Sequence, residues 1–113
     1  MKIKQYEIWL ADLNPQFGTE AGKTRPVDIV QTDLLNEFHP STIVCPVTTN
    51  VKADATILRI HLSKGSAKLR ENCDIMIDQV RAIDNRRLLK KIGDLPEEKI
   101  SMMKENMSIM LDL

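Results

Sequence analysis

The chain has 113 residues, and 16 lysine and arginine residues balance 16 aspartate and glutamate residues. A chain of this length forms one domain that buries roughly two thirds of the surface its unfolded form exposes, so we predict a single domain over residues 1–113. The zero net charge excludes a strong overall field for polyanions. No apolar signal segment or membrane-spanning run is visible, so we expect a cytoplasmic protein.

Short alternations of apolar and polar residues predict strands with one face in the core. Pro46 lies inside one of them and indicates an edge strand or a bulge. The predicted strands are Tyr6–Asp12, Pro26–Thr32, Thr42–Thr49, Thr56–Ser63 and Cys73–Val80, with Arg81–Asp84 extending the last. Their sequential order favours antiparallel pairing over alternating strand and helix units.

Three segments have helical character. Asp33–Phe38 has room for a single turn, and Asn85–Leu89 for a short helical segment. A longer helix is predicted from about Leu95 to the C-terminus, opened by Asp94 and Glu97 as a capping box. Together with the strands, these segments describe a small twisted barrel with helical additions.

The predicted C-terminal helix carries two apolar stripes. We expect the first to pack on the barrel and the second to contact another subunit or a partner. The first stripe contains Ile100, Met103, Met107, Met110 and Leu111, and the second contains Met102, Ile109 and Leu113.

Cysteine and histidine are too few and too widely spaced for the usual metal sites. Cys45 and Cys73 are expected to be reduced, partly buried thiols. His39 and His61 are expected to be structural or solvated. Neither a metal nor another cofactor is implied.

The loop of residues 14–24 is longer than the usual hairpin connection, and such loops often carry function. Its glycines lack the spacing of a nucleotide-binding loop, so we interpret it as a mobile lid. It ends at Arg25, whose guanidinium matches phosphate oxygens and stays charged. Arg25 therefore predicts a phosphodiester site.

A threonine at the end of a neighbouring strand, Thr48, is predicted to donate to the same phosphate. Glu20 and Asp78 are possible proton acceptors, and each is equally a plain surface carboxylate. Arginine does not serve as a base at its ordinary pKa, so the general base stays unassigned.

Five segments in order carry a resemblance to a known family. They are Ile8–Pro15, Gly18–Glu20, Thr24–Val27, Pro46–Thr48 and Asp78–Asp84. These resemble the successive motifs of the MazF/PemK family, the toxin endoribonucleases of type II toxin–antitoxin systems. The resemblance implies a mainly β (α+β) fold, a small SH3-like barrel of the CcdB/PemK type with short helices and a C-terminal helix.

The resemblance also implies an activity and partners. The activity is that of an mRNA interferase, a sequence-specific, metal-independent endoribonuclease that cuts single-stranded RNA and so inhibits translation and growth. The products would be a 2',3'-cyclic phosphate or 3'-phosphate and a 5'-hydroxyl. The implied partners are a second copy in a homodimer and a MazE-like antitoxin, together with which the toxin binds DNA.

The family's catalytic arginine and threonine fall on Arg25 and Thr48. Met76 and Thr19 stand where the PemK branch has an arginine and a histidine, so the arrangement of the MazF branch is preferred. Phe17 is equally open as a base-stacking residue and as a hydrophobic pin for the loop. The residues expected to bind RNA are Phe17, Thr19, Glu20, Lys23, Thr49, Asp78 and Gln79.

Two other functions remain open. One is a non-enzymatic CcdB-like toxin of the same fold that inhibits DNA gyrase, with its contacts concentrated on the C-terminal helix. The other is a barrel that binds RNA without cutting it.

Overall fold

The computed structural model describes residues 2–113, which form antiparallel strands, two α-helices and three short 3-10 turns. The strands are β1 (Glu7–Asp12), β2 (Thr24–Ile29), β3 (Ser41–Thr48), β4 (Arg59–Leu62), β5 (Cys73–Met76), β6 (Arg81–Asp84) and β7 (Leu88–Asp94). The helices are α1 (Asp33–Asn36) and α2 (Glu97–Leu111), and the turns are η1 (Ser66–Lys68), η2 (Ile77–Gln79) and η3 (Asn85–Arg87). Neither helix within residues 2–113 is long and apolar enough to cross a membrane.

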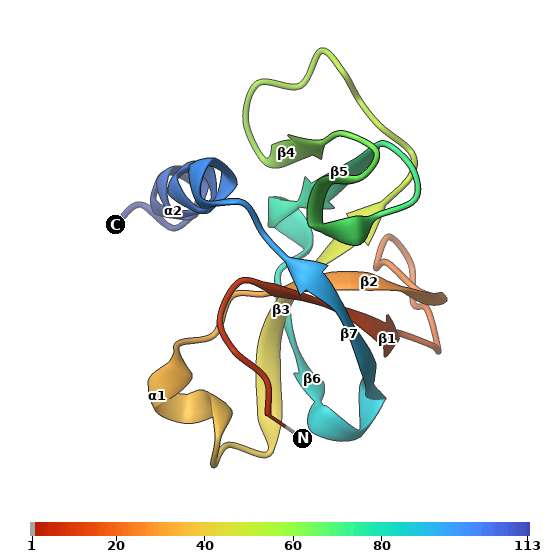
Figure 1. Cartoon of the computed structure of the whole chain (residues 1–113), viewed down its shortest axis with the longest axis vertical. Helices are drawn as coiled ribbons and strands as arrows, with labels where there is room; N and C mark the ends of the chain where they lie inside the picture. Colours follow the sequence, from red (N-terminus) through yellow and green to blue (C-terminus); the bar gives the residue numbers. More distant parts are fainter. Residues whose placement is uncertain (1) are drawn as a thin grey trace.

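The strands form one strongly curved sheet in the order β4-β5-β3-β2-β1-β7, and β6 pairs with β3 beside β5 (Figure 1). Every pairing is antiparallel. The mainly β fold with a C-terminal helix is therefore confirmed, as is the single turn predicted after β2, which the structure shows as α1.

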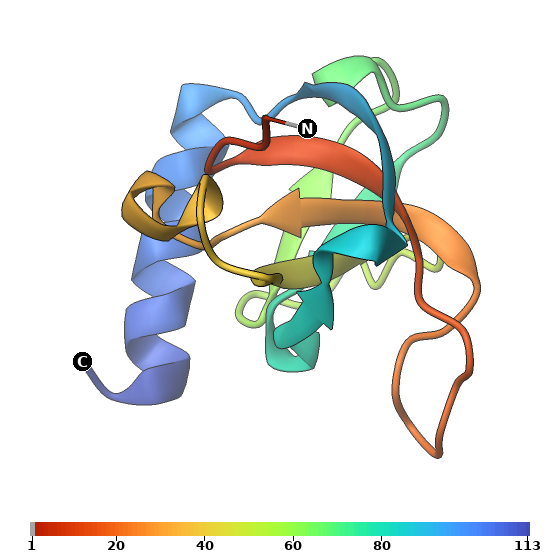
Figure 2. The ribbon, with the colours of Figure 1, turned by 90° about the horizontal axis from the view of Figure 1, so that it is seen from below.

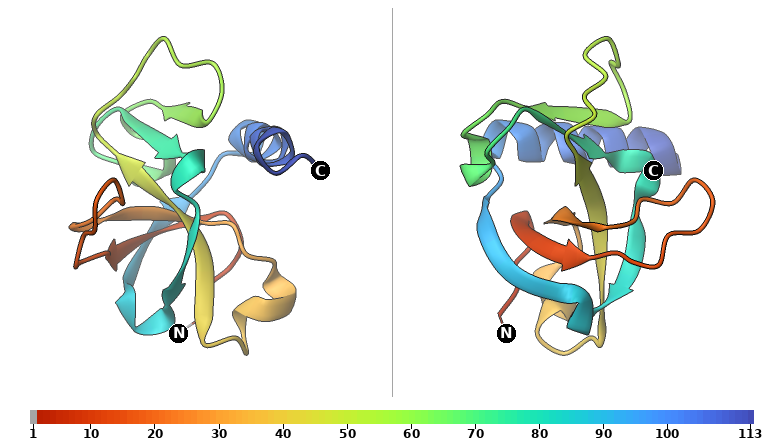
Figure 3. Two further views of the ribbon diagram at one scale, coloured as in Figure 1. Left: turned by 180° about the vertical axis from the view of Figure 1, so that it is seen from behind. Right: turned by 90° about the vertical axis from the view of Figure 1, so that its right-hand side faces the viewer.

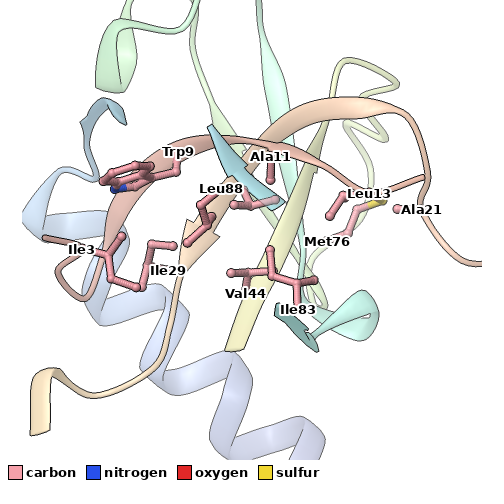
Figure 4. Packing of buried hydrophobic residues seen from close by; sticks show 11 residues of the cluster. Ile3, Trp9, Ala11, Leu13, Ala21, Ile29, Val44, Met76, Ile83 and Leu88 are labelled. Atoms are coloured by element: carbon pink, nitrogen blue, oxygen red, sulfur yellow. The ribbon is translucent and has the colours of Figure 1, made fainter. Parts of the chain in front are cut away.

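The core lies on both sides of β1. Ile8 belongs to one buried cluster, whereas Trp9 and Ala11 belong to the other. Figure 4 shows the second of these clusters, with Trp9 near one end and Met76 near the other. Both faces of β1 are therefore covered, so the prediction that only one face of this strand lies in the core was wrong.

The third strand is central rather than an edge, which corrects the interpretation of its proline. β3 pairs with β2 on one side, and on the other side it changes partner from β6 to β5. Pro46 falls between the stretch Ser41–Val44 that pairs with β6 and the residues that pair with β5. The missing N–H therefore lies where the ladder is already interrupted, which agrees with the predicted irregularity.

The segment predicted as one strand over Cys73–Val80 is two structures. β5 ends at Met76 and is followed by η2. β5 pairs with the C-terminal end of β3 and β6 pairs with its N-terminal end, so the chain must turn between them. Two further boundaries differ as well, because β2 begins at Thr24 and β4 covers only Arg59–Leu62.

The helical segment predicted over Asn85–Leu89 is helical only as far as Arg87, and the strand β7 that follows was missed. Its pairing with β1 contains two register shifts, which break the period-two alternation that reveals a strand in a sequence. Gly93 of β7 lies against η1 so closely that a Cβ atom there would be 2.2 Å from the carbonyl oxygen of Ala67.

Helix α2 begins after Pro96 and has no side-chain cap. The predicted capping box was wrong, because Asp94 belongs to β7, where its carboxylate lies 3.0 Å from Nζ of Lys91. Met103 is fully buried in the first stripe, a burial that contributes roughly 1.5–3 kcal/mol. Ile100, Met107 and Met110 are partly buried against the same cluster, whereas Leu111 is 53% exposed.

All three residues of the second stripe are exposed, but only Met102 and Ile109 belong to α2, because the helix ends at Leu111 and Leu113 lies beyond it. The helix and the long loop between β1 and β2 lie on opposite sides of the molecule (Figure 2). The two features predicted to meet other molecules are thus well separated.

Candidate active site

Arg25 is the second residue of β2, opposite Ala11 of β1. Its Nε donates to the carbonyl oxygen of Gly22 at 2.8 Å. Within residues 2–113, neither of its terminal guanidinium nitrogens has a hydrogen-bond partner. The side chain is therefore held near its base while the fork of donors stays available to an anion.

Thr48 is the last residue of β3. Its Oγ1 accepts from the backbone N–H of Asn50 at 3.1 Å. A hydroxyl that accepts one bond keeps its own hydrogen for donation. Thr48 can therefore donate to a phosphate oxygen.

The pairing of β2 with β3 relates these two residues. Val27 lies opposite Pro46, and Arg25 and Thr48 each lie two residues further along the same direction. Since side chains two apart on a strand share a face, the same end and face of the strand pair carry both residues. No short sequence motif shows this relation, because 23 residues separate Arg25 from Thr48.

The loop between β1 and β2 has a fixed base and a projecting tip (Figure 2). Leu13 and Ala21 are buried in the cluster that contains Met76, and Figure 4 shows these three side chains at the same end of it. The N–H of Leu13 donates to the carbonyl of Lys23 at 2.9 Å. Phe17 at the tip is 68% exposed, so it does not pin the loop to the core in this structure.

Gln79 ties this loop to η2. Its side-chain nitrogen donates to the carbonyl of Thr19 at 3.1 Å, and its side-chain oxygen accepts from the N–H of Ala21 at 3.2 Å. The sequence placed Gln79 near the RNA bases, but here its amide is occupied by the loop. Its structural role is to position the lid.

The remaining predicted RNA-binding side chains are exposed. Thr19, Glu20 and Lys23 lie on the loop, Asp78 lies in η2, and Thr49 follows β3. The loop contacts Arg25 of β2 and Gln79 of η2, so the loop lies with these two elements at one end of the sheet.

An open groove of about 580 Å³, which was not predicted, lies on the other face of this end of the sheet, since its lining includes Pro26 and Thr49 rather than Arg25 and Thr48. Pro26 and Thr49 line it together with the cations Lys68, Arg70 and Lys90. These cations come from η1, the turn after it and β7. Only the tertiary fold brings these cations together, so no motif in the sequence predicts the groove.

A second feature missed from the sequence is the surroundings of His61. Its Nδ1 lies 2.6 Å from Oδ1 of Asp74, so the histidine is structural rather than solvated. Its pKa is raised, first by the hydrogen bond with Asp74 and then by the carbonyl of Ala55. Within residues 2–113, no group of three or more His, Cys, Asp or Glu side chains is arranged to hold a metal ion.

Comparison with known proteins agrees with this arrangement. Residues 4–111 match the model of a family described as PemK-like, MazF-like toxins of type II toxin–antitoxin systems. An endoribonuclease MazF from Staphylococcus epidermidis is 32% identical over 111 residues, which cover 98% of this chain and 92% of that protein.

Two solved structures have the same fold. A crystal structure of MazF from Deinococcus radiodurans has a TM-score of 0.84 at 18% identity and covers 100% of this chain and 99% of that chain. A MazE–MazF crystal structure from the same organism has a TM-score of 0.79 at 18% identity, with 100% and 98% covered. From the family match and the sequence identity, this chain belongs to the PemK-like, MazF-like toxins of type II toxin–antitoxin systems.

Proposed function

We propose that this protein is a sequence-specific endoribonuclease that cuts single-stranded RNA in the cytoplasm without a metal ion, as the toxin of a toxin–antitoxin pair. The observation that carries the proposal is the pair of Arg25 and Thr48, which end two neighbouring strands with a free guanidinium fork and a hydroxyl free to donate. The 32% identity to an endoribonuclease supports the reaction class.

In the proposed reaction, the ribose 2'-oxygen attacks the adjacent phosphorus while the bond to the 5'-oxygen breaks. The leaving 5'-oxygen takes up a proton, from the group that accepted the 2'-hydroxyl proton or from solvent, so the products are a 2',3'-cyclic phosphate and a 5'-hydroxyl. Water can then open the cyclic phosphate to a 3'-phosphate. Negative charge grows on the equatorial phosphate oxygens, where Arg25 binds as a bidentate donor. Thr48 donates to one of the same oxygens and orients the phosphate.

Proton transfer in this reaction needs an acceptor for the 2'-hydroxyl. Arginine remains protonated, so Arg25 stabilises charge instead. Glu20 and Asp78 are the exposed carboxylates beside the loop and η2, and we propose that one of them accepts the proton.

Recognition of unpaired RNA relies on bases that are splayed out and stacked on side chains. The exposed ring of Phe17 suits stacking, and Thr19, Glu20 and Lys23 offer hydrogen bonds along the same loop. Thr49 at the rim of the cationic groove suits the backbone of the same strand. Gln79 would act by holding the loop.

The partners in this proposal are a second copy of the chain and a MazE-like antitoxin. The Deinococcus radiodurans relative was crystallised as a MazE–MazF assembly. The exposed Met102 and Ile109 of α2 offer apolar contact surface, and the helix lies on the opposite side of the molecule from the loop (Figure 2). RNA would cross the junction between the two toxin copies, and the antitoxin would cover part of the toxin surface.

The gyrase inhibitor is not favoured as an alternative. Such a toxin does not need the pair of Arg25 and Thr48, and the relative in Staphylococcus epidermidis is an endoribonuclease. A protein that binds RNA without cutting would give a gel shift with no new fragments.

The test is incubation of the purified protein with one long single-stranded RNA in EDTA, without gyrase. We expect fragments at a short recurring sequence, with 5'-hydroxyl ends and cyclic phosphate at the 3' ends. Intact RNA, or cleavage that appears only when a divalent metal is added, would contradict the proposal.

A further inference from the structure

A buried carboxylate lies on the strand next to Thr48. Asp74 is the second residue of β5, directly opposite Thr48 in the pairing of β3 with β5. Its side chain has no exposed surface. A buried charge is costly unless it is paired and hydrogen-bonded, so its partners define its role.

Three donors satisfy the two oxygens of Asp74. Oδ1 lies 2.6 Å from Nδ1 of His61, while Oδ2 accepts from Nη1 of Arg59 at 3.1 Å and from the backbone N–H of Lys52 at 2.9 Å. Burial raises the pKa of Asp74, but the three hydrogen bonds outweigh that effect, and the pKa lies below its ordinary value. The carboxylate is therefore ionised in the folded protein.

The contacts of Asp74 continue to the Thr48 hydroxyl. The same Nη1 of Arg59 donates to the carbonyl of Asn50 at 3.0 Å. The N–H of Asn50 in turn donates to Oγ1 of Thr48 at 3.1 Å. Asp74 thus connects to Thr48 through hydrogen bonds at Arg59 and at the backbone of Asn50, whose carbonyl and N–H are joined covalently through its Cα. We name this series the Asp74 relay.

His61 holds the other part of the loop over residues 49–58, which projects beside β4 and β5 (Figures 1 and 3). Its Nε2 lies 3.0 Å from the carbonyl of Ala55. Both of its ring nitrogens therefore face oxygens that only accept, an arrangement that favours the doubly protonated imidazolium.

The charged groups around His61 act in opposite directions on its pKa. The hydrogen bond with Asp74 is the largest influence and raises the pKa, and the Ala55 carbonyl adds to it. Burial and the positive charge of Lys99 on α2 lower it. The net shift is upward.

We propose that Asp74 is a positioning residue that orients the Thr48 hydroxyl for the phosphate, and that the His61 cation keeps the 49–58 loop docked while it does so. This inference rests on the proposed role of Thr48 in cleavage. Neither Asp74 nor His61 reaches the substrate, because both act through the backbone of the loop.

The variant Asp74→Asn tests the relay with almost no change in size. We expect kcat for RNA cleavage to fall about tenfold or more, as small misplacements of a catalytic group do, with KM much less affected. The backbone amides of Asn50 and Lys52 should exchange with solvent faster than in the parent. The matched control is Asp84→Asn, which removes an exposed carboxylate paired with Arg86 at 2.9 Å and should leave kcat and both amides unchanged.

A second variant keeps the test decisive if Asp74→Asn does not fold. Arg59→Gln breaks the relay and leaves Asp74 with His61 and the Lys52 amide, so the same fall in kcat is expected. Parent-like kcat in a folded Asp74→Asn or Arg59→Gln protein would overturn the inference. If the parent itself cuts no RNA, the proposed function fails instead, and the exchange of the Asn50 amide still tests the relay.

The pH profile tests His61. A raised histidine pKa means that docking is complete at low pH and is lost as pH rises through that pKa, above about 6.5. The parent kcat should therefore show a descending limb there, matched by the imidazole pKa measured by NMR, and His61→Gln should remove the limb. A limb that persists in His61→Gln would exclude this part of the inference.

Discussion

At the scale of single residues, Asp28 is the least expected side chain in the core. It is fully buried in β2 between Ile8 and Cys45 on the two neighbouring strands. Neither of its carboxyl oxygens has a hydrogen-bond partner within residues 2–113. Burial raises its pKa well above the ordinary value, which favours the neutral acid in the folded protein.

Replacing Asp28 should stabilise the protein. An unpartnered buried polar group costs about 1–3 kcal/mol, so we expect Asp28→Val to raise the free energy of unfolding at pH 7 by about that amount. The measurement is urea denaturation. The control is Asp84→Val, at an exposed carboxylate whose pKa is held at about 2 by Arg86; this change should bring no gain.

The same residue predicts the direction of a pH effect. The unfolded chain loses the Asp28 proton near pH 4, whereas the folded chain retains it to higher pH. The unfolded state then binds fewer protons, so the Asp28 contribution to stability falls as pH rises between these two values. Urea denaturation from pH 5 to pH 8 should show this slope in the parent and lose it in Asp28→Val. An identical slope in the two proteins would show that Asp28 is ionised when folded.

At the scale of elements, the sequence predicted the parts whose signals are local. The turn at α1, the long loop and the helix after Pro96 follow from proline, glycine and periodic apolar residues close together in the chain. β7 was missed because two register shifts disrupt its alternation. The break after Met76 was missed because it depends on which half of β3 each later strand pairs with.

The candidate site likewise has a part that was predicted from the sequence and a part that was not. Arg25 and Thr48 were predicted as site residues from residue type, position and family resemblance, and the strand register explains why they share one end of the sheet. The Asp74 relay was not found, since its members come from β5, β4 and the loop after β3. Residues that meet only through tertiary pairing leave no spacing pattern in the sequence.

The contact of Gln79 with the loop gives an element-scale prediction. In Gln79→Ala, the N–H of Ala21 loses its acceptor, so its hydrogen exchange should become several-fold faster and KM for RNA should rise. The N–H of Lys23 serves as the internal control, because it donates to Asn14 at 2.9 Å and does not contact Gln79. Unchanged exchange at Ala21 would show that Gln79 does not hold the loop.

At the scale of the whole molecule, the long loop and helix α2 lie apart (Figure 2). With no net charge, the molecule depends on local cations such as Arg25 and those of the groove to attract RNA. Helix α2, which carries the exposed Met102 and Ile109, lies on the opposite side of the molecule from the loop (Figure 2).

The stripe should be required for association. Met102 and Ile109 are 38% and 53% exposed, and charges there should weaken contact with a second copy or with the antitoxin. We expect the double variant Met102→Asp and Ile109→Asp to shift the oligomeric state or the antitoxin affinity, measured by light scattering and by titration. The control is Ser101→Asp on an exposed polar position of the same helix. A double variant that behaves as the parent in both measurements would show that the stripe is not required for association.

The most direct test of the central claim is the cleavage rate of Arg25→Ala under single-turnover conditions in EDTA, with Arg86→Ala as the matched control. Arg86 is 91% exposed and pairs only with Asp84 within the described chain. We expect Arg25→Ala to fold normally and to lose about 10²–10³-fold or more in rate, as removal of a donor to a developing charge does, while Arg86→Ala cuts as the parent does. Parent-like cleavage by folded Arg25→Ala would contradict the account.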